Sequence, residues 1–299
     1  MNRRGIFFGF CAYALWGFFP LYWKQLSIVP APQLLAHRIG WSFLLMIGII
    51  LVSRQWAAFR AALSGRTLRL YSAAAVLIAI NWLTYVWAVN ANFVVETSLG
   101  YFINPLLSVL MGVLILHERL RPAQWVPISL AAAGVGFLTV VYGRLPWIAL
   151  LLALSFGFYG LLKKIAPLGS LFGLTLETGI LFLPAAAFLG WVEANGSGAF
   201  GHAGWTVSLL LFGAGATTTI PLLLFASAAK RIPLSLLGIL QYVAPTIQFL
   251  LGVLVYREPF DGLRLVGFSI VWLALILYVV EGYLQHRVGQ PPVPELGEG

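Results

Sequence analysis

The chain contains the run Ile148-Ala149-Leu150-Leu151-Leu152-Ala153-Leu154, in which no side chain is polar. A strand of a membrane β-barrel would alternate apolar and polar side chains with a period of two. The unbroken run therefore excludes a barrel strand and indicates a helix in lipid, where each backbone N–H and C=O must bond within its own segment. The fold class that we predict is an all-α membrane protein.

Similar apolar segments recur on both sides of this run and fill most of the 299 residues. Hydrophobic residues make up 61% of the chain and charged residues 9%, against roughly 25% in soluble globular proteins, so a soluble protein is excluded. Because a spanning helix needs about 20 residues, we predict ten transmembrane helices. Their expected ranges are 5–23, 33–52, 70–90, 97–116, 122–141, 146–162, 171–191, 205–227, 233–256 and 264–284.

The 18 Lys and Arg residues outnumber the 9 Asp and Glu residues, which gives a net charge of +9. The basic residues fall singly or in pairs between apolar segments, so they form no clustered surface for a nucleic acid. Most of them lie at one end of the predicted bundle if the N-terminus is inside, as expected of cytoplasmic loops. We therefore predict a multi-pass protein of a bacterial-type inner (plasma) membrane, embedded in lipid. Both termini are expected in the cytoplasm, the C-terminal one as a disordered tail over residues 286–299.

Two parts of the chain repeat at an offset of 140 residues. Residues 105–118 and 245–258 each contain a proline, six residues, Gly-Val-Leu, three residues and a glutamate. We therefore predict two homologous repeats of five helices each, residues 5–141 and 146–285. Because five is an odd number, the second repeat must enter the membrane in the opposite sense, so the repeats are inverted.

Inverted repeats place a solute site near the middle of the membrane, between the two halves, and allow that site to face either side in turn. The pattern therefore favours a transporter that works by alternating access. A duplication that only builds a stable helix bundle is the alternative.

Four short stretches resemble a known family. They are His37-Arg38-Ile39-Gly40-Trp41-Ser42, Asn81-Trp82, Trp87-Ala88-Val89-Asn90 and Ser98-Leu99-Gly100-Tyr101-Phe102-Ile103-Asn104-Pro105-Leu106. These stretches look like the RarD branch of the EamA-type drug/metabolite transporter superfamily, the so-called chloramphenicol-sensitive proteins. The resemblance covers residues 5–285. It implies ten helices, an inverted pseudo-twofold and a central cavity lined by the first, third and fourth helices of each half.

Three ionisable residues lie inside predicted spans, where a charge costs about 2.5–3.5 kcal/mol on insertion scales. They are His37 and Arg38 in the second span and Glu177 in the seventh, and the 140-residue offset relates His37 to Glu177. One hypothesis is that Glu177, paired with Arg38 or His37, carries a proton or holds the halves together by an ion pair that changes with conformation. The alternative is a fixed structural pair near the water interface.

Prolines in the fourth and ninth spans, Pro105 and Pro245, each remove a backbone donor and are expected to kink both helices. Polar side chains share a face near each proline: Tyr101 and Asn104 in the fourth span, and Gln241 and Gln248 in the ninth. These polar faces are expected to line the solute cavity. Hydrogen bonding between helices would explain the amides equally well.

Aromatic residues extend the predicted cavity. Asn81 and Tyr85 share a face of the third span, Tyr13 and Trp16 lie together in the first, and the second half supplies Tyr159 and residues 217–221. A cavity of this kind is aromatic and neutral, so we expect it to bind a flat or amphipathic solute. Residues near span ends are assigned to the membrane surface instead: Trp23, Trp125, Trp147 and Trp205 as interface anchors, and Glu118 in a solvated local pair with Arg119.

Two function classes compete with the transporter. An intramembrane enzyme would need a nucleophile with its base or a metal cluster, and the chain contains no GxSxG and no HExxH motif. A lipid scramblase would need a polar groove open to lipid, and a simple channel would not need inverted, proline-containing halves. The sequence therefore predicts a permease that exports small organic metabolites or drugs, and not an enzyme. No cofactor and no metal are expected, while the substrate, proton coupling and oligomeric state stay open.

Overall fold

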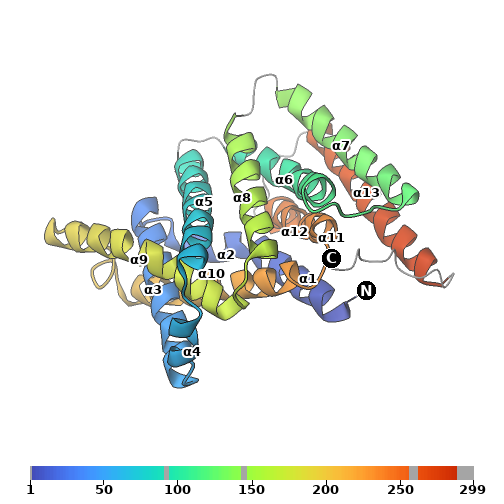
Figure 1. Cartoon of the computed structure of the whole chain (residues 1–299). Coiled ribbons are helices and arrows are strands. Elements are labelled where there is room, and N and C mark those ends of the chain that lie inside the picture. Colours follow the sequence, from blue (N-terminus) through green and yellow to red (C-terminus); the bar gives the residue numbers. More distant parts are fainter. Residues whose placement is uncertain (1, 91–93, 143–146, 256–261, 288–299) are drawn as a thin grey trace.

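The computed structural model describes residues 2–90, 94–142, 147–255 and 262–287. These residues form helices joined by turns, with no strand among them (Figure 1). The helices are α1 (Arg3–Gly17), α2 (Phe19–Trp23), the 3-10 turn η1 (Lys24–Leu26), α3 (Ala31–Val52), α4 (Trp56–Ala61), α5 (Gly65–Asn90), α6 (Val94–Leu114), α7 (Pro122–Tyr142), α8 (Trp147–Ile165), α9 (Ser170–Ala194), α10 (Trp205–Ala229), α11 (Leu234–Leu240), α12 (Val243–Leu250), the π turn η2 (Leu251–Val255) and α13 (Gly262–Arg287). The predicted all-α class is confirmed for the described residues.

Eight helical segments in the described part of the chain are long and apolar enough to cross a membrane. They are Arg3–Leu26, Ala31–Val52, Gly65–Tyr85, Pro122–Val141, Trp147–Ile165, Ser170–Ala194, Trp205–Ala229 and Leu265–Gly282. Two shorter apolar helices, Gly100–Leu114 and Leu234–Gln248, occupy the predicted fourth and ninth spans. The chain is thus a multi-pass membrane protein, and its tenfold crossing of the bilayer stays a prediction. The disordered tail is predicted over residues 286–299. Its first two residues, His286 and Arg287, belong to α13 instead, and residues 288–299 lie outside the described residues.

The first predicted span is two helices, because α1 ends at Gly17 and α2 begins at Phe19. Pro20 has no backbone N–H, so the carbonyl of Trp16 loses its partner in the helix. The amide of Gln248 on α12 donates to that carbonyl, with 3.1 Å between Nε2 and the oxygen. A side chain from α12 therefore satisfies the carbonyl that the break between α1 and α2 leaves without a helical partner.

The ninth predicted span is interrupted as well. α11 ends at Leu240 and α12 begins at Val243, so the break lies one turn before Pro245, where the missing donor frees a carbonyl. In contrast, α6 continues as one helix through Pro105. The two equivalent prolines therefore sit in different local structures.

Helices far apart in the sequence pack together in pairs. In Figure 1, α7 runs beside α13 at one edge of the molecule, and α9 lies at the opposite edge, where it packs on α3. α6 packs on both α8 and α11, α1 packs on α10, and α5 packs on α8. Each of these contacts joins the first predicted half to the second, so the two halves interlock.

Glycines allow the closest of these approaches. A Cβ atom at Gly238 of α11 would lie 2.7 Å from both the carbonyl oxygen of Pro105 and the Cβ of Ser108 on α6. A Cβ at Gly100 of α6 would lie 3.0 Å from the carbonyl oxygen of Ala149 on α8. Small residues that let backbones touch are the usual means of packing helices in lipid, where burial of apolar surface between helices gains little.

We expect Gly238→Ala to lower the thermal unfolding temperature of the purified protein in detergent. The added methyl group meets backbone atoms that cannot move aside, and overpacking of this kind costs about 1–3 kcal/mol. Gly136→Ala in α7 is the matched control, because a Cβ there meets nothing within 4 Å. An equal loss of stability in the two variants would contradict the close contact between α6 and α11.

Candidate functional site

Aromatic rings from α1, α8 and α10 meet in the middle of the molecule. Trp16 lies 5.7 Å from both Phe156 and Phe225, measured between ring centroids, and Tyr13 lies 5.5 Å from Trp16. Tyr159 stacks on Phe225 at 6.0 Å with an interplanar angle of 12°. The structure thus brings together the predicted cavity residues Tyr13, Trp16 and Tyr159. Tyr13 and Tyr159 are fully buried in this cluster, whereas Trp16 is half-buried.

A buried cation lies between α2, α3, α5 and α10. The guanidinium carbon of Arg38 is 4.8 Å from the ring centroid of Trp23 and 4.7 Å from that of Trp82, so the two indoles hold it from two directions. Its Nε donates to Oγ1 of Thr218 at 3.0 Å. Only 8% of the residue is exposed.

Two tyrosines extend the surroundings of Arg38. The rings of Tyr85 on α5 and Tyr101 on α6 lie 5.8 Å apart in an edge-to-face arrangement, and the charge of Arg38 interacts with both hydroxyl groups. The predicted residues Arg38, Tyr85 and Tyr101 therefore come together. Trp23, which the sequence assigns to the membrane interface, packs on this cation.

The predicted amides divide into two groups. Asn81 donates to the carbonyl of Leu152 at 2.9 Å and to Oγ of Ser155 at 3.0 Å, so it joins α5 to α8, as Gln248 joins α12 to α1. Asn104 Oδ1 and Gln241 Oε1 are buried and accept no hydrogen bond from the described residues. The first two amides serve helix packing, and the other two keep an acceptor that a solute could use.

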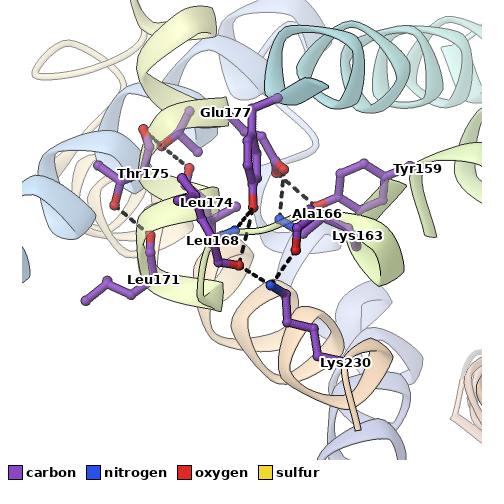
Figure 2. Close-up of polar contacts among 11 residues, drawn as sticks. Tyr159, Lys163, Ala166, Leu168, Leu171, Leu174, Thr175, Glu177 and Lys230 are labelled. Carbon is purple, nitrogen blue, oxygen red and sulfur yellow. Dashed lines mark hydrogen bonds and ion pairs between the residues drawn. The ribbon is translucent and has the colours of Figure 1, made fainter. Parts of the chain in front are cut away.

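Glu177 of α9 pairs with Lys163 of α8 and not with the predicted partners Arg38 or His37. Its Oε1 lies 2.8 Å from Nζ of Lys163, and its Oε2 accepts a hydrogen bond from the hydroxyl of Tyr159 at 3.1 Å (Figure 2). Both charged side chains are almost fully enclosed, with 3% and 2% of their surfaces exposed. The sequence used Lys163 only to orient the chain in the membrane, although its position four residues after Tyr159 on the same helix face is a usable signal.

The turn between α8 and α9 is fastened around this pair. Lys230 at the end of α10 donates to the carbonyls of Ala166, at 2.7 Å, and Leu168, as Figure 2 shows. Tyr71 of α5 both accepts from the N–H of Leu168 at 3.2 Å and lies beneath Nζ of Lys163. Four helices are therefore tied together at this end of the molecule.

His37 has a different setting from its neighbour Arg38. It lines a hollow of about 370 Å³ between α3, α9 and the following loop, together with Gln33, Glu193 and other residues. Its ring lies 5.4 Å from that of Phe200. The expected ion pair with Glu177 is absent, because that carboxylate is held by α8.

Every acidic side chain that the structure describes has partners. Glu118 accepts from the backbone N–H groups of Leu234, at 2.6 Å, and Ser235, at 3.0 Å, so it caps α11 instead of forming the predicted local pair with Arg119. Glu193 pairs with His202 and Glu281 with Arg121, each at 2.8 Å. Within the described ranges, no three His, Cys, Asp or Glu side chains are grouped so as to hold a metal ion. Glu258, the repeat equivalent of Glu118, lies outside the described residues.

Comparison with known proteins gives consistent results. Residues 3–140 match the EamA-like transporter family. The chain is 48% identical to Protein RarD of Streptomyces exfoliatus, over 92% of this chain and 88% of the relative, and 48% identical to the uncharacterized transporter YojE of Bacillus subtilis (strain 168), over 93% and 94%. A solved crystal structure with 20% identity superposes with a TM-score of 0.67, over 95% of this chain and 100% of the other, and so has the same fold.

We expect Glu177→Gln to destabilise the protein strongly, because it leaves the cation of Lys163 buried without a counter-charge. Removal of one partner from a buried ion pair typically costs about 3–5 kcal/mol. Lys163→Met should do the same, and the double variant Lys163→Met/Glu177→Leu should lose less than the sum of the single variants. Thermal unfolding in detergent measures all three.

The exposed pair of Glu193 and His202 provides the control for this cycle. Its side chains are 57% and 64% exposed, so Glu193→Gln should change the unfolding temperature little. Additive losses in the Lys163 and Glu177 variants would show that the two charges do not stabilise each other.

Proposed function

The chain belongs to the EamA-like transporter family, in its RarD-type branch, and from this premise we propose that it is a carrier of small organic solutes. Two inverted halves of five helices, residues 5–141 and 146–285, would expose one central site to each side of the membrane in turn. The family match to residues 3–140 ends where the first of these halves ends, which supports this division.

Contacts between equivalent residues support a twofold relation between the halves. Residues near such an axis must touch their own equivalents, which here lie 140 positions apart. Trp16 touches Phe156 with 5.7 Å between centroids, and Phe102 touches Tyr242 at 6.3 Å. Whole helices follow the same rule, since α3, α6 and α7 pack on their equivalents α9, α11 and α13.

The relative direction of α6 and its equivalents α11 and α12 is the main support for inverted repeats. Along α11 and α12 the residue numbers of the contacts rise, while along α6 they fall. Ser235 at the start of α11 lies against Gly112, Gly238 against Ser108, and Tyr242 against Phe102. Equivalent helices are therefore antiparallel. Two repeats in the same orientation would have made these helices point the same way.

The solute site that we propose lies around Arg38, Tyr85 and Tyr101, next to the unpaired acceptor of Asn104. These residues come from α3, α5 and α6 of the first half, and Thr218 of α10 joins them from the second. Residues at a junction of both halves are the ones that a rocking motion would expose to either side. The aromatic cluster around Trp16 would form the floor, so that a flat or amphipathic solute fits.

We further propose that the pair of Lys163 and Glu177 closes one end of the pathway in this conformation. The pair ties α8 to α9, and Lys230 of α10 holds the turn between them. Both residues belong to the second half, so a movement of α9 relative to α8 within that half would be needed to separate them. The carboxylate of Glu177 would then lose its counter-charge and could take up a proton, which would couple transport to protons. This coupling predicts that the conformational exchange depends on Glu177.

Both termini are proposed to face the cytoplasm of a bacterial cell, with the helices in the inner membrane. Bacterial transporter relatives and the apolar helices support that membrane. A Cβ at Gly5 would touch Ile232 and Arg231, and Lys164 donates to the carbonyl of Ile232 at 2.8 Å. Basic residues from distant segments thus meet at the N-terminal end of the bundle, as the positive-inside rule expects of a cytoplasmic face.

The inverted topology can be tested with two exposed positions that follow the ends of α3 and α9, the equivalent helices of the two halves. In a Cys11→Ala background, an impermeant maleimide added to right-side-out vesicles should label Asn195→Cys directly. It should label Arg54→Cys only after permeabilisation, because the two positions lie on opposite faces if the repeats are inverted. Labelling of both from the same side would exclude the inversion and with it the alternating carrier.

Counterflow tests the carrier itself. Proteoliposomes preloaded with the solute that best distinguishes overproducing from deleted cells should accelerate uptake of the labelled solute. Tyr101→Ala should raise the half-saturating solute concentration about tenfold or more if its ring and hydroxyl contact the solute. Trp205→Ala should leave this concentration unchanged, because Trp205 is 81% exposed. No acceleration by preloading would contradict a carrier, and unchanged kinetics in Tyr101→Ala would remove that residue from the site.

A further inference from the structure

We propose that the solute carries an anionic group, most simply a carboxylate, which binds the guanidinium of Arg38. The proposal deepens the carrier function above and rests on it. It also changes the expectation from the sequence, which favoured a neutral pocket.

The first support is that none of the described acidic side chains neutralises Arg38. A guanidinium has five N–H donors, and among the described residues only Nε of Arg38 has an acceptor, the hydroxyl of Thr218 at 3.0 Å. Among the described side chains, no carboxylate lies within ion-pair distance of Arg38, since Glu118, Glu177, Glu193 and Glu281 are held elsewhere. The terminal donors of Arg38 therefore have no acid partner among those residues.

The second support comes from the equivalent place in the other half. An offset of 140 residues relates Trp23 to Lys163, and Arg38 lies one position beyond the equivalent of Glu177. The end of the first helix therefore contacts the start of the next in both halves, through Trp23 and Arg38 in one and Lys163 and Glu177 in the other. The second contact is neutral overall, whereas the first retains a full positive charge.

The rings around Arg38 position the cation without neutralising it. Trp23 and Trp82 hold its guanidinium at 4.8 and 4.7 Å, which offsets part of the cost of burial and fixes the plane of the group. A planar fork held in this way suits two parallel hydrogen bonds to a carboxylate. The charge of Arg38 acts on the hydroxyls of Tyr85 and Tyr101, which hydrogen-bond each other. One hydroxyl proton of this pair is therefore left to donate to the same anion.

The rest of the solute has a partner as well. Asn104 lies three residues after Tyr101 on α6, hence on the same face, and its buried Oδ1 has no donor among the described residues. A hydroxyl or amino group of the solute would satisfy this acceptor. The site therefore fits a small organic anion that also carries a hydrogen-bond donor.

The test uses the purified full-length protein and a bacterial metabolite extract separated by ion exchange into anionic, neutral and cationic fractions. We expect the anionic fraction to raise the thermal unfolding temperature in detergent and to drive counterflow. For the active compound, conversion of the carboxylate to its primary amide should weaken binding about tenfold to hundredfold. Inorganic chloride or phosphate at equal concentration should not reproduce the effect.

Three variants connect the effect to Arg38. Arg38→Gln should abolish the preference for the acid over the amide, and Arg38→Lys should keep part of it, because the charge remains without the planar fork. Arg231→Gln is the matched control: Arg231 also lies over an aromatic ring, Phe8 at 5.5 Å, but is exposed at the far end of α10. It should keep the full preference.

Two results would overturn the proposal. Protection and counterflow by the neutral or cationic fraction alone would exclude an anionic solute and leave the carrier function intact. An acid preference that persists in a folded Arg38→Gln would remove Arg38 from the site. If no fraction gave counterflow, the carrier function would fail first, and the anion site with it. Because the fraction test uses the unmodified protein, it stands even if Arg38→Gln does not fold.

Discussion

The hydrocarbon interior of a bilayer offers no water to pair with a polar group, and the rest of this structure depends on that constraint. Helices satisfy it for the backbone, since each N–H and C=O bonds within its own segment. Where a proline breaks a helix, a side chain must supply what is missing. Gln248 donates to the carbonyl of Trp16 at 3.1 Å and thereby joins α12 to α1.

The same constraint governs the few charges inside the molecule. Lys163 and Glu177 neutralise each other, and Tyr159 and Tyr71 complete their surroundings. Arg38 is treated differently, since two indoles and one hydroxyl surround it and none of the described acids does. A neutral pair suits a contact that holds the protein together, whereas an uncompensated cation suits a place where charge arrives from outside. The junction of Trp23 with Arg38 thus contains an unpaired charge among the described residues, whereas the corresponding junction of Lys163 with Glu177 is a neutral pair.

Packing of the halves follows from small residues and not from polar contacts alone. Gly238 brings α11 onto the backbone of α6 near Pro105, and Gly17 and Gly157 occupy equivalent contacts, with Ile247 and with Met111 and Leu107 respectively. Such contacts are short-ranged and repeat at the offset seen in the sequence. They let helices from the two predicted halves approach each other closely.

The sequence by itself determined the helical class, the apolar segments and the internal repeat. Length, hydropathy and the need for backbone hydrogen bonds are local properties, so the run at residues 148–154 is enough to predict a helix in lipid. The positions of helix breaks were partly predictable, because proline acts on the carbonyl one turn earlier: α12 begins just before Pro245, but α6 continues through Pro105.

Only the tertiary structure decided which side chains meet. Arg38 and Thr218 are 180 positions apart in the chain, and no local pattern indicates their hydrogen bond. Likewise, Trp23 looked like an interface anchor, and Glu177 looked like a partner for Arg38, because hydropathy shows depth in the membrane and not the neighbour at that depth. Side chains point in all directions around a helix axis, and the packing of the helices against one another selects which of them become partners.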